Sequence, residues 1–567
     1  MRHFATQESL NVDLLLDKEK RSNIIQAEKD KLTNKDAVFI LLDVVRTLAR
    51  QGIAFRGRST NSTHKQDEED GNFNQIVELL SRHCPSLNRW LNEVRLRPYH
   101  VTYMSHDSQN EMIDILAENI RDKVKEEVSD SKMFSVMADT TPDTSNKDRL
   151  AVDVRYVKED SPSFAVKERL IEVKERTDKT GDGQASDILT SLEDSGLKSS
   201  ELVFQSYDFA SNMSGIHNGA QAEIEKKLDR KVPYIPCQAH RWNTLVEHGC
   251  ETKKSRTRWM ARAESIKAVW TSLEAIVKAL EEAFAAPKLD AKVKATISGL
   301  LKNVKSFDFT VSLMFVKNIM FKTKILSEIL QQEELNIVNA LELTKATLTS
   351  LERINNEETE MNDMIEAAVL YAKTSFQIDA KEEFTRSHRV RRIPRRYDEN
   401  PQETTAFTFY QYYRKEFKCV LDVLISQFRD KMQPTLDVIA PIAHALQVPL
   451  HEPSPEIIQK LAEMFPNDVD ADVLEAELEV FKNIVDHKEE LKNGSMDNIV
   501  QFAYEQRKTL PLRCKAYQLM LTAPISVAKD ERTFSHLKFV KSVYRSTMGD
   551  KRLDNLMLLN CEKDLTD

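Results

Sequence analysis

The stretch "MFSVMADTTPDTSNKDRLAVDVRYV", residues 133–157, decides how this chain folds. It holds two apolar, β-rich runs separated by a cluster of turn-forming residues, and the first run ends on Asp139. Strand interiors rarely hold an unpaired carboxylate, because removing a carboxylate from water is costly. We therefore expect Asp139 to find partners elsewhere in the chain.

The segments that follow this stretch predict a mixed α/β sheet. A third strand is expected at residues 163–173, a helix at 184–197, a fourth strand at 201–209, a helix at 219–229 and a fifth short strand at 232–237. The order is β-β-β-α-β-α-β. Three strands joined by tight turns, followed by alternating helices and strands, favour a mixed sheet with helices on its faces.

The flanking regions read as helix. Apolar residues recur at helical spacing through most of residues 1–125 and 255–515, and the last 55 residues resemble two helices with apolar faces. With 567 residues, 30% of them charged and only 12 glycines, the chain should form two to four largely helical units. No run approaches the roughly 20 apolar residues that span a bilayer, and the first residues lack the apolar core of a signal peptide. We expect a soluble protein without membrane contact.

Cysteine spacing and net charge exclude some classes of function. The six cysteines form no CxxC pair, which argues against a disulfide framework and against a structural zinc finger. The net charge of −9 argues against a protein that coats DNA by bulk attraction. Any contact with nucleic acid must then come from local basic patches.

A second aspartate repeats the placement of Asp139. Asp208 ends the fourth expected strand in "LVFQSYDFASNMSG". If the two strands are neighbours, the two carboxylates meet at one edge of the sheet and repel each other unless a cation lies between them. Mg²⁺ suits such a site, and a third carboxylate would permit two ions. An aspartate at a strand end is also a common turn or cap residue, so both interpretations stand.

Five motifs extend this pattern along the chain. "MADTTPD", "YDFASNMSG", "CQAH", "TRW" and "ERTFS", in this order, resemble the hAT superfamily of cut-and-paste DNA transposases, and above all its domesticated or decayed zinc-finger MYM-type and TTF-finger-like members. The resemblance implies an RNase H-like core interrupted by a large all-helical insertion. The expected domains are a helical N-terminal region at 1–125, the first part of the core at 126–250, the insertion at 251–510, and a C-terminal core helix with the dimerisation region at 511–567.

The resemblance also implies a catalytic triad. Asp139 and Asp208 match the first and second catalytic aspartates, and Glu531 in "DERTFS" matches the catalytic glutamate on a late helix. These three side chains would bind Mg²⁺ or Mn²⁺. The bound ions would serve the hydrolysis and strand transfer of phosphodiesters at transposon ends.

Three further residues are implied as DNA contacts. His240 belongs to a CxxH signature with Cys237, and is read as a DNA-contacting or acid–base residue, or else as a buried histidine. Arg258 and Trp259 match an arginine–tryptophan pair that could hold a phosphate and stack on an extruded base. An ordinary core tryptophan is the alternative. The basic flank "KKSRTRWMAR" favours the DNA contact.

An arginine run interrupts the helical region. Residues 386–396 hold six arginines and a proline, which cannot be buried unpaired, so an exposed loop is expected. Arg391, Arg392, Arg395 and Arg396 could contact phosphates or form a nuclear address. A merely solvated loop is the alternative. We predict a nuclear protein.

The last helix predicts self-association. Leu553, Leu556 and Leu559 form an apolar stripe at helical spacing, and the resemblance links this region to a homodimer or higher oligomer. One helix is not expected to hide every apolar residue of this segment, which would leave apolar area for a partner. The alternative is that the stripe completes the core.

Two functional hypotheses follow. The first is a metal-dependent DNA transposase with an Asp-Asp-Glu triad, which the matched carboxylates favour. The second is a domesticated, catalytically silent protein that acts through dimerisation and through binding of a partner or of DNA. Two departures from the family favour the second: no BED- or TTF-type cysteine/histidine array precedes the core, and only seven residues separate Cys250 from Arg258 at the join with the insertion.

Overall fold

A computed structural model describes residues 18–57, 71–97, 101–160, 163–208, 210–237, 263–286, 289–330, 337–387, 407–446, 454–488, 501–502, 504–524, 528–542, 545 and 547–566. Around the sheet lie α2 (Lys18–Arg50), α4 (Asn72–His83), α5 (Pro85–Asn92), η1 (Val94–Leu96), α6 (His106–Ser131), β1 (Phe134–Pro142), β2 (Asp148–Asp160), β3 (Ser163–Glu175), α7 (Gly181–Asp194), η3 (Ser199–Glu201), β4 (Leu202–Tyr207), α8 (Ser211–Ser214) and α9 (Ala220–Leu228). The long helical stretch holds α11 (Ala263–Thr271), α12 (Leu273–Ala285), α13 (Ala291–Val304), α14 (Phe307–Leu330), α15 (Ile337–Asn356), α16 (Glu358–Phe376), α17 (Ala380–Ser387), α18 (Phe409–Leu446), α19 (Pro455–Met464) and α20 (Ala471–Asp486). The C-terminal part holds α23 (Pro511–Thr522), α24 (Ala528–Val540), α25 (Asp550–Cys561) and η6 (Lys563–Leu565).

The four strands form one mixed sheet in the order β3-β2-β1-β4. β1 and β2 are antiparallel, and so are β2 and β3, as expected for strands that few residues separate along the chain. β4 runs parallel to β1, which requires the crossover that α7 supplies. The chain is thus mostly helical around a small mixed sheet, and the predicted succession of three strands, a helix and a fourth strand along the chain is confirmed.

The predicted fifth strand at 232–237 is not a full strand. It makes a single parallel bridge, between Gln205 of β4 and Tyr234, and the N–H of Ile235 donates to the carbonyl of Gln205 at 2.8 Å. Pro233 and Pro236 have no N–H to donate to a ladder, which limits the pairing. This corrects the expectation of a fifth strand while keeping the segment beside β4.

Both faces of the sheet are covered. Phe134, Val136 and Ala138 of β1 lie in one apolar cluster with residues of α2, α6 and α25. Met137 of β1 and Phe204 of β4 lie in a second cluster with residues of α14, α16, α18 and α23. Because side chains alternate along a strand, β1 contributes to both clusters and holds them together.

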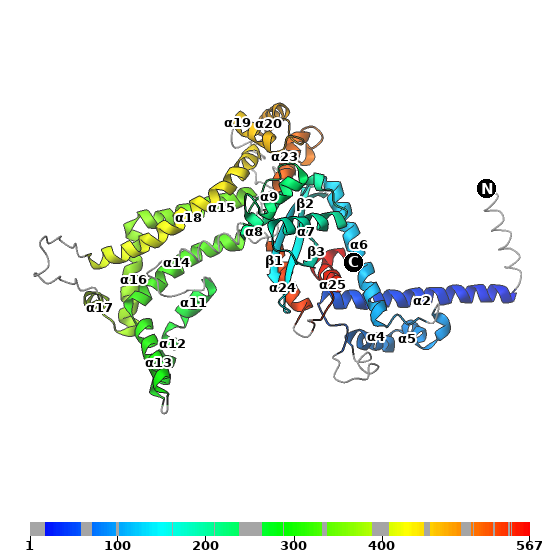
Figure 1. Cartoon of the computed structure of the whole chain (residues 1–567), viewed down its shortest axis with the longest axis horizontal. Coiled ribbons are helices and arrows are strands. Elements are labelled where there is room, and N and C mark those ends of the chain that lie inside the picture. The colour runs from blue at the N-terminus through cyan, green and yellow to red at the C-terminus, as the bar shows by residue number, and fades with distance from the viewer. Residues whose placement is uncertain are drawn as a thin grey trace, which may run out of the picture.

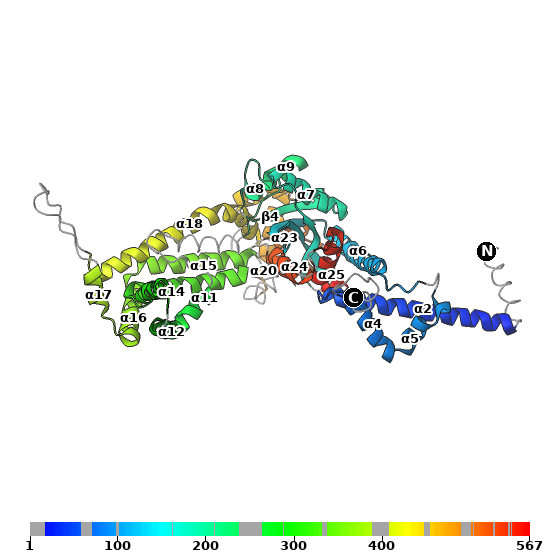
Figure 2. The same cartoon turned by 60° about the horizontal axis from the view of Figure 1, so that its bottom comes forward.

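The helices extend away from the sheet on two sides. In Figure 1 and Figure 2, α11–α18 project from one side of the sheet, while α2, α4 and α5 lie on the other. The described secondary structure between residues 263 and 488 is helical throughout. The domain boundaries given above stay predictions. No helix of the described ranges combines the length and the apolar character needed to cross a bilayer.

The C-terminal segment covers the edge strand β3. An uncovered edge strand presents unpaired N–H groups that can recruit another chain. Here the N–H of Leu170 donates to Glu562 Oε1 at 2.9 Å, and the N–H of Val173 donates to Asp554 Oδ1 at 2.7 Å. Carboxylates from the end of the chain therefore occupy positions that a further strand would fill.

Glu562 connects three parts of the molecule. Its side chain is fully buried, with Arg169 of β3 at 2.8 Å from one carboxylate oxygen and Lys529 of α24 at 2.8 Å from the other. A buried carboxylate is stable only when cations and hydrogen bonds replace the water it has lost. Glu562 thereby holds α24 and η6 against β3.

The turn between β1 and β2 is held in the same way. Asp143 lies between Arg149 and Lys541, at 2.8 and 2.7 Å, and all three side chains are buried. Burial alone would raise the pKa of Asp143, but the hydrogen bonds from Lys541 and Arg149 outweigh it and hold the pKa well below its usual range. The carboxylate therefore stays charged and ties the end of α24 to the turn.

We expect Glu562→Gln to destabilise the protein by about 3 kcal/mol or more, because it leaves buried cations without their counter-charge. Urea unfolding measures the loss. Hydrogen exchange should also accelerate in residues 163–175, since the amide of Leu170 loses its charged acceptor.

Glu78→Gln is the matched control. Glu78 pairs with Arg82 at 2.7 Å on an exposed helix face, and such pairs contribute less than about 1 kcal/mol. Equal losses in the two variants, or unchanged exchange in β3, would contradict the role assigned to Glu562.

Candidate functional site

Asp139 and Asp208 occupy neighbouring positions at one edge of the sheet. β1 and β4 are parallel, and their register pairs the residues that precede the two aspartates, Ala138 and Tyr207. Asp139 lies within β1, Asp208 follows β4 directly, and both are partly exposed. The carboxyl ends of parallel strands meet at one edge, which is where ligands bind in many α/β sheets.

Both carboxylates also stabilise the turns that follow them. The N–H of Thr140 donates to Asp139 Oδ1 at 2.7 Å, and the N–H of Ala210 donates to Asp208 Oδ1 at 3.2 Å. The hydroxyl of Tyr234 donates to the carbonyl of Asp208 at 3.2 Å. The turn role that the sequence left open is therefore real for both residues.

Glu531 lies on α24, which packs against β1 and β2. Its side chain is partly exposed, whereas the side chain of Asp530 beside it is fully buried. The structure thus brings Asp139 and Asp208 together and packs the helix that carries Glu531 on the strand that carries Asp139. Whether the three residues form a catalytic triad stays a prediction.

Two further aspartates lie beside Asp139, and the sequence patterns had not singled them out. Asp153 is on β2, two residues beyond Ala151, the cross-strand partner of Asp139, so both aspartates face the same side of the sheet. Asp530 approaches from α24. The signals available were a charge inside the apolar strand "LAVDVRYV" and an acid directly before the motif glutamate.

Asp153 and Asp530 form a buried carboxyl pair. Both side chains are 0% exposed, and none of their oxygens receives a hydrogen bond from a donor group in the described part of the chain. Burial raises the pKa of Asp153 to about 6. Burial also raises the pKa of Asp530 well above its ordinary value, and the charges of Asp153 and Asp139 add to the rise. The pair therefore binds a proton up to a higher pH than an exposed carboxyl group does.

The predicted metal ions stay a prediction. In the ranges that the structure describes, no group of three or more His, Cys, Asp or Glu side chains is arranged to hold a metal ion. Asp139 and Asp208 offer the oxygen ligands that Mg²⁺ and Mn²⁺ prefer, and they are the residues that would hold one.

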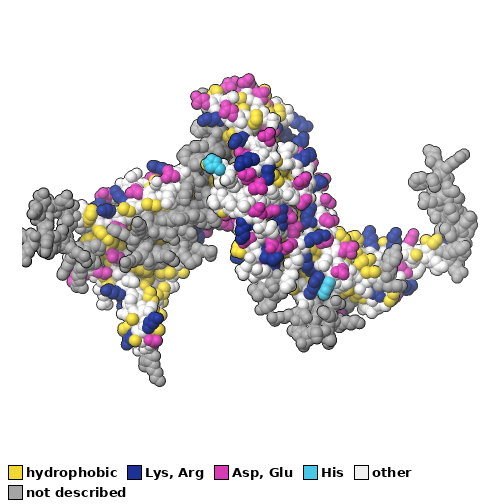
Figure 3. All heavy atoms as spheres, in the orientation of Figure 1, with side chains coloured by type: hydrophobic (Ala, Val, Ile, Leu, Met, Phe, Trp, Pro, Cys, Tyr) yellow, Lys and Arg dark blue, Asp and Glu magenta, His cyan; other side chains and the backbone are white. Residues whose placement is uncertain are grey.

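The predicted DNA contacts lie outside the described residues. This applies to His240, to the pair Arg258 and Trp259, and to the arginines of the basic run, Arg391, Arg392, Arg395 and Arg396. Cys237 of the CxxH signature is described and is fully buried, with its N–H donating to the carbonyl of Tyr207 at 3.3 Å. On the face drawn in Figure 3, cationic and anionic side chains are interspersed over the described part of the core.

The predicted dimerisation stripe is part of the core. Leu553, Leu556 and Leu559 are 0%, 3% and 0% exposed, and they pack in the cluster that includes residues of α2 and α6. The expectation of apolar area left at these leucines is therefore wrong. α25 is enclosed by β3, α6, α24 and α2, so that all of its leucines find partners within the chain.

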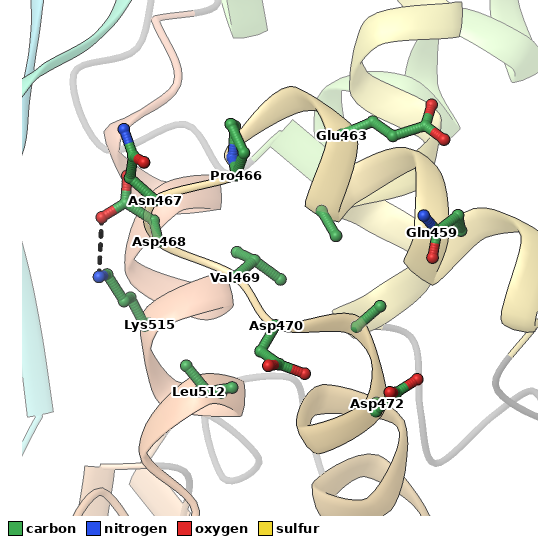
Figure 4. A pocket seen from close by; sticks show the side chains of 12 residues that line it. Gln459, Glu463, Pro466, Asn467, Asp468, Val469, Asp470, Asp472, Leu512 and Lys515 are labelled. Carbon is green, nitrogen blue, oxygen red and sulfur yellow. Dashed lines mark ion pairs between the residues drawn. The ribbon is translucent and has the colours of Figure 1, made fainter.

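Two cavities lie away from the carboxylates. One of about 700 Å³ lies between α19, α20 and α23, where Asp468 pairs with Lys515 at 2.7 Å (Figure 4). Asp470 in the same cavity caps α20 by accepting from the N–H of Val473 at 3.1 Å. A second cavity, of about 720 Å³, is lined by residues of α6, β2 and α23. None of the three predicted triad residues lines either cavity.

Comparison with known families finds matches for two segments of the chain, which contain the motifs "MADTTPD", "YDFASNMSG" and "ERTFS". Residues 6–219 match the family described as "ZMYM1/FAM200, RNase-like domain", and residues 482–565 match the "hAT family C-terminal dimerisation region". The chain is therefore similar to the hAT transposase-like proteins in both of these segments. The matched ranges include Asp139 and Asp208 at the sheet edge in the first case, and all of α24 and α25 in the second.

This hAT-like protein is also similar to two proteins over almost its whole length. Both carry the name "52 kDa repressor of the inhibitor of the protein kinase", one from Homo sapiens and one from Mus musculus. Each is 21% identical over 96% of this chain, and the match covers 76% of the human protein and 77% of the mouse protein.

We expect Asp530→Asn to make the hAT-like protein more stable at pH 8, by on the order of 2 kcal/mol, and to leave stability near pH 4 almost unchanged. The folded state holds the protons of the pair to a higher pH than the unfolded chain does. The favourable contribution of the pair is therefore complete below the unfolded pKa, near pH 4, and is lost as pH rises through about 6.

The measurement is the free energy of unfolding from pH 4 to 8 for wild type and variant. Asp363→Asn, at an exposed helix position, is the control and should show no pH-dependent difference. A variant that is less stable than wild type at pH 8 would contradict the shared proton.

Proposed function

We propose that this hAT-like protein is domesticated and catalytically silent, and that it acts as a dimer that binds a partner. The observation that carries the proposal is the similarity over 96% of the chain to proteins named for repression, not for DNA cleavage. The match of residues 482–565 to a dimerisation region supports the dimer. The short join between Cys250 and Arg258 supports the loss of transposase activity.

The proposal includes an RNase H-like core. The strand order β3-β2-β1-β4, the parallel β1–β4 pair and the segment bridged beside β4 at Tyr234 support it, since they place five segments in the order 3-2-1-4-5. The printed description of the family that residues 6–219 match, an RNase-like domain, supports it as well. In a silent protein this core serves as a scaffold that positions the two helical parts.

An active transposase is the second candidate. It is favoured by the neighbouring positions of Asp139 and Asp208 and by the packing of the helix of Glu531 on β1. These residues would hold Mg²⁺ or Mn²⁺, which supplies charge stabilisation at a phosphodiester. The DNA partner would then be transposon ends. In either case we propose a nuclear location, for which the arginine run is the candidate address.

A plasmid assay separates the two candidates without knowledge of transposon ends. We expect wild type to nick supercoiled plasmid in Mn²⁺ no more than the Asp139→Asn/Asp208→Asn double variant does, because the silent protein does not use these carboxylates for chemistry. Nicking by wild type but not by the double variant would overturn the proposal of a catalytically silent protein and would support an active transposase.

Light scattering tests the dimer independently. We expect a mass about twice the 65.2 kDa of one chain for wild type and for the double variant alike, because Asp139 and Asp208 do not belong to the segment that matches a dimerisation region. A single chain at every concentration would remove the dimer from the proposed function.

A further inference from the structure

The C-terminal segment covers only part of the outer edge of β3. This strand is the first in the sheet order β3-β2-β1-β4, so one of its two sides has no neighbouring strand. On that side the N–H of Leu170 donates to Glu562. The N–H of Val173 donates to Asp554. Both contacts lie in the second half of β3, and the first half, residues 163–168, is left without them.

The strand register shows which groups of this first half point outward. Pairing with β2 is regular, without a bulge, from Leu170 back to Phe164. The N–H and C=O groups of successive residues in an antiparallel strand point to opposite sides. Because the N–H of Leu170 points away from β2, the main-chain groups of Phe164, Val166 and Glu168 point away from β2 as well.

These outward groups have no partner among the described residues. Outside the β2–β3 ladder, no main-chain hydrogen bond joins Phe164, Val166 or Glu168 to another described residue. All three residues are partly exposed, so the core does not enclose them. Three donors and three acceptors in one line form the edge on which a further strand can pair.

The side chains beside this edge differ on the two faces of the sheet. Phe164 and Val166 share one face and are partly buried, and the ring of Phe164 packs edge-on against Tyr504 at a centroid distance of 5.1 Å. Lys167 faces the opposite side, because side chains alternate along a strand. It is partly exposed and forms no ion pair with any residue that the structure describes. The edge thus has an apolar flank on one face and an unpaired cation on the other.

We propose that the open half of β3, residues 163–168, binds an extended peptide segment of a partner protein as an added strand. The peptide pairs its main-chain groups with the outward groups of Phe164, Val166 and Glu168. Its apolar side chains lie beside Phe164 and Val166, and an acidic side chain lies beside Lys167. The inference rests on the proposed function, since it assigns a binding site to the partner named there.

A second copy of the chain suits this edge less well than a peptide does. Two copies paired antiparallel along residues 163–168 would bring both Lys167 side chains onto one face of a short ladder. Like charges on neighbouring strands repel each other. An acidic side chain at the same place forms an ion pair with Lys167 instead, so the charge favours a partner of different sequence.

Binding of a synthetic peptide tests the site. The probe is an acetylated and amidated peptide of about seven residues, the length of an ordinary strand, in which valine and glutamate alternate. We expect calorimetry to show saturable binding to wild type with a Kd below about 1 mM. The same peptide with lysine in place of glutamate should bind about tenfold more weakly, because it brings a like charge to Lys167.

Methylation of the peptide backbone separates an added strand from binding through side chains alone. In a strand, the N–H groups of the valines point to one side and those of the glutamates to the other. We therefore expect N-methylation of one of these two sets to weaken binding at least about tenfold, and N-methylation of the other set to have little effect. Equal effects of the two sets would overturn the added strand.

Two variants test the residues of β3. Val166→Pro removes one outward N–H but none that pairs with β2, so it should weaken peptide binding at least about tenfold with an unchanged circular dichroism spectrum. Lys167→Glu should reverse the preference, so that the lysine peptide binds better than the glutamate peptide. Lys278→Glu, at an exposed position of α12, is the matched control and should leave the preference as in wild type.

Three outcomes would overturn the site. They are an absence of saturable binding by wild type, a preference that Lys167→Glu leaves unchanged, and a wild-type dimer that Val166→Pro converts into single chains. The last result would show that a second copy holds the edge. Plasmid nicking and the mass of wild type are measured separately, so a failure of this site is distinguishable from a failure of the proposed function.

Discussion

The structure depends on the contact between the edge strand β3 and the C-terminal residues of the chain, which we call the capture of the edge strand. Glu562 accepts the N–H of Leu170 and binds Arg169 and Lys529 in the interior. Buried charges are tolerated only when they are paired and hydrogen-bonded, so these groups have to come together in one geometry. That geometry fixes β3, α24 and the last residues relative to one another.

The candidate site follows from this capture. Asp139 lies on β1, and α24, which carries Asp530 and Glu531, is held on the sheet by ion pairs with Asp143 at one end and Glu562 at the other. The same packing buries the Asp153–Asp530 pair and raises both pKa values. These carboxyl groups come together only when α24 packs on the sheet, whether or not the site carries out chemistry.

The capture also explains the surface that remains for a partner. α25 packs against β3, α2 and α6. Among the large apolar side chains of the C-terminal region that the structure describes, Phe539 is the one that stays exposed. Dimerisation through the leucines of α25 would require the core to open.

The sequence by itself determined the local order and the family. Alternation and turn residues placed β1 to β4, and the strand ends placed Asp139 and Asp208 at one edge. Five short motifs identified a hAT-like chain. The sequence pattern predicted a full strand at 232–237, where two prolines limit the hydrogen bonding to β4. The pattern also did not indicate that Asp153 lies against a second carboxyl group. Tertiary structure alone decided which apolar stripe is buried and which carboxyl groups have raised pKa values. The physical reason is that burial and pKa depend on neighbours brought together from distant parts of the chain, as Asp153 and Asp530 are.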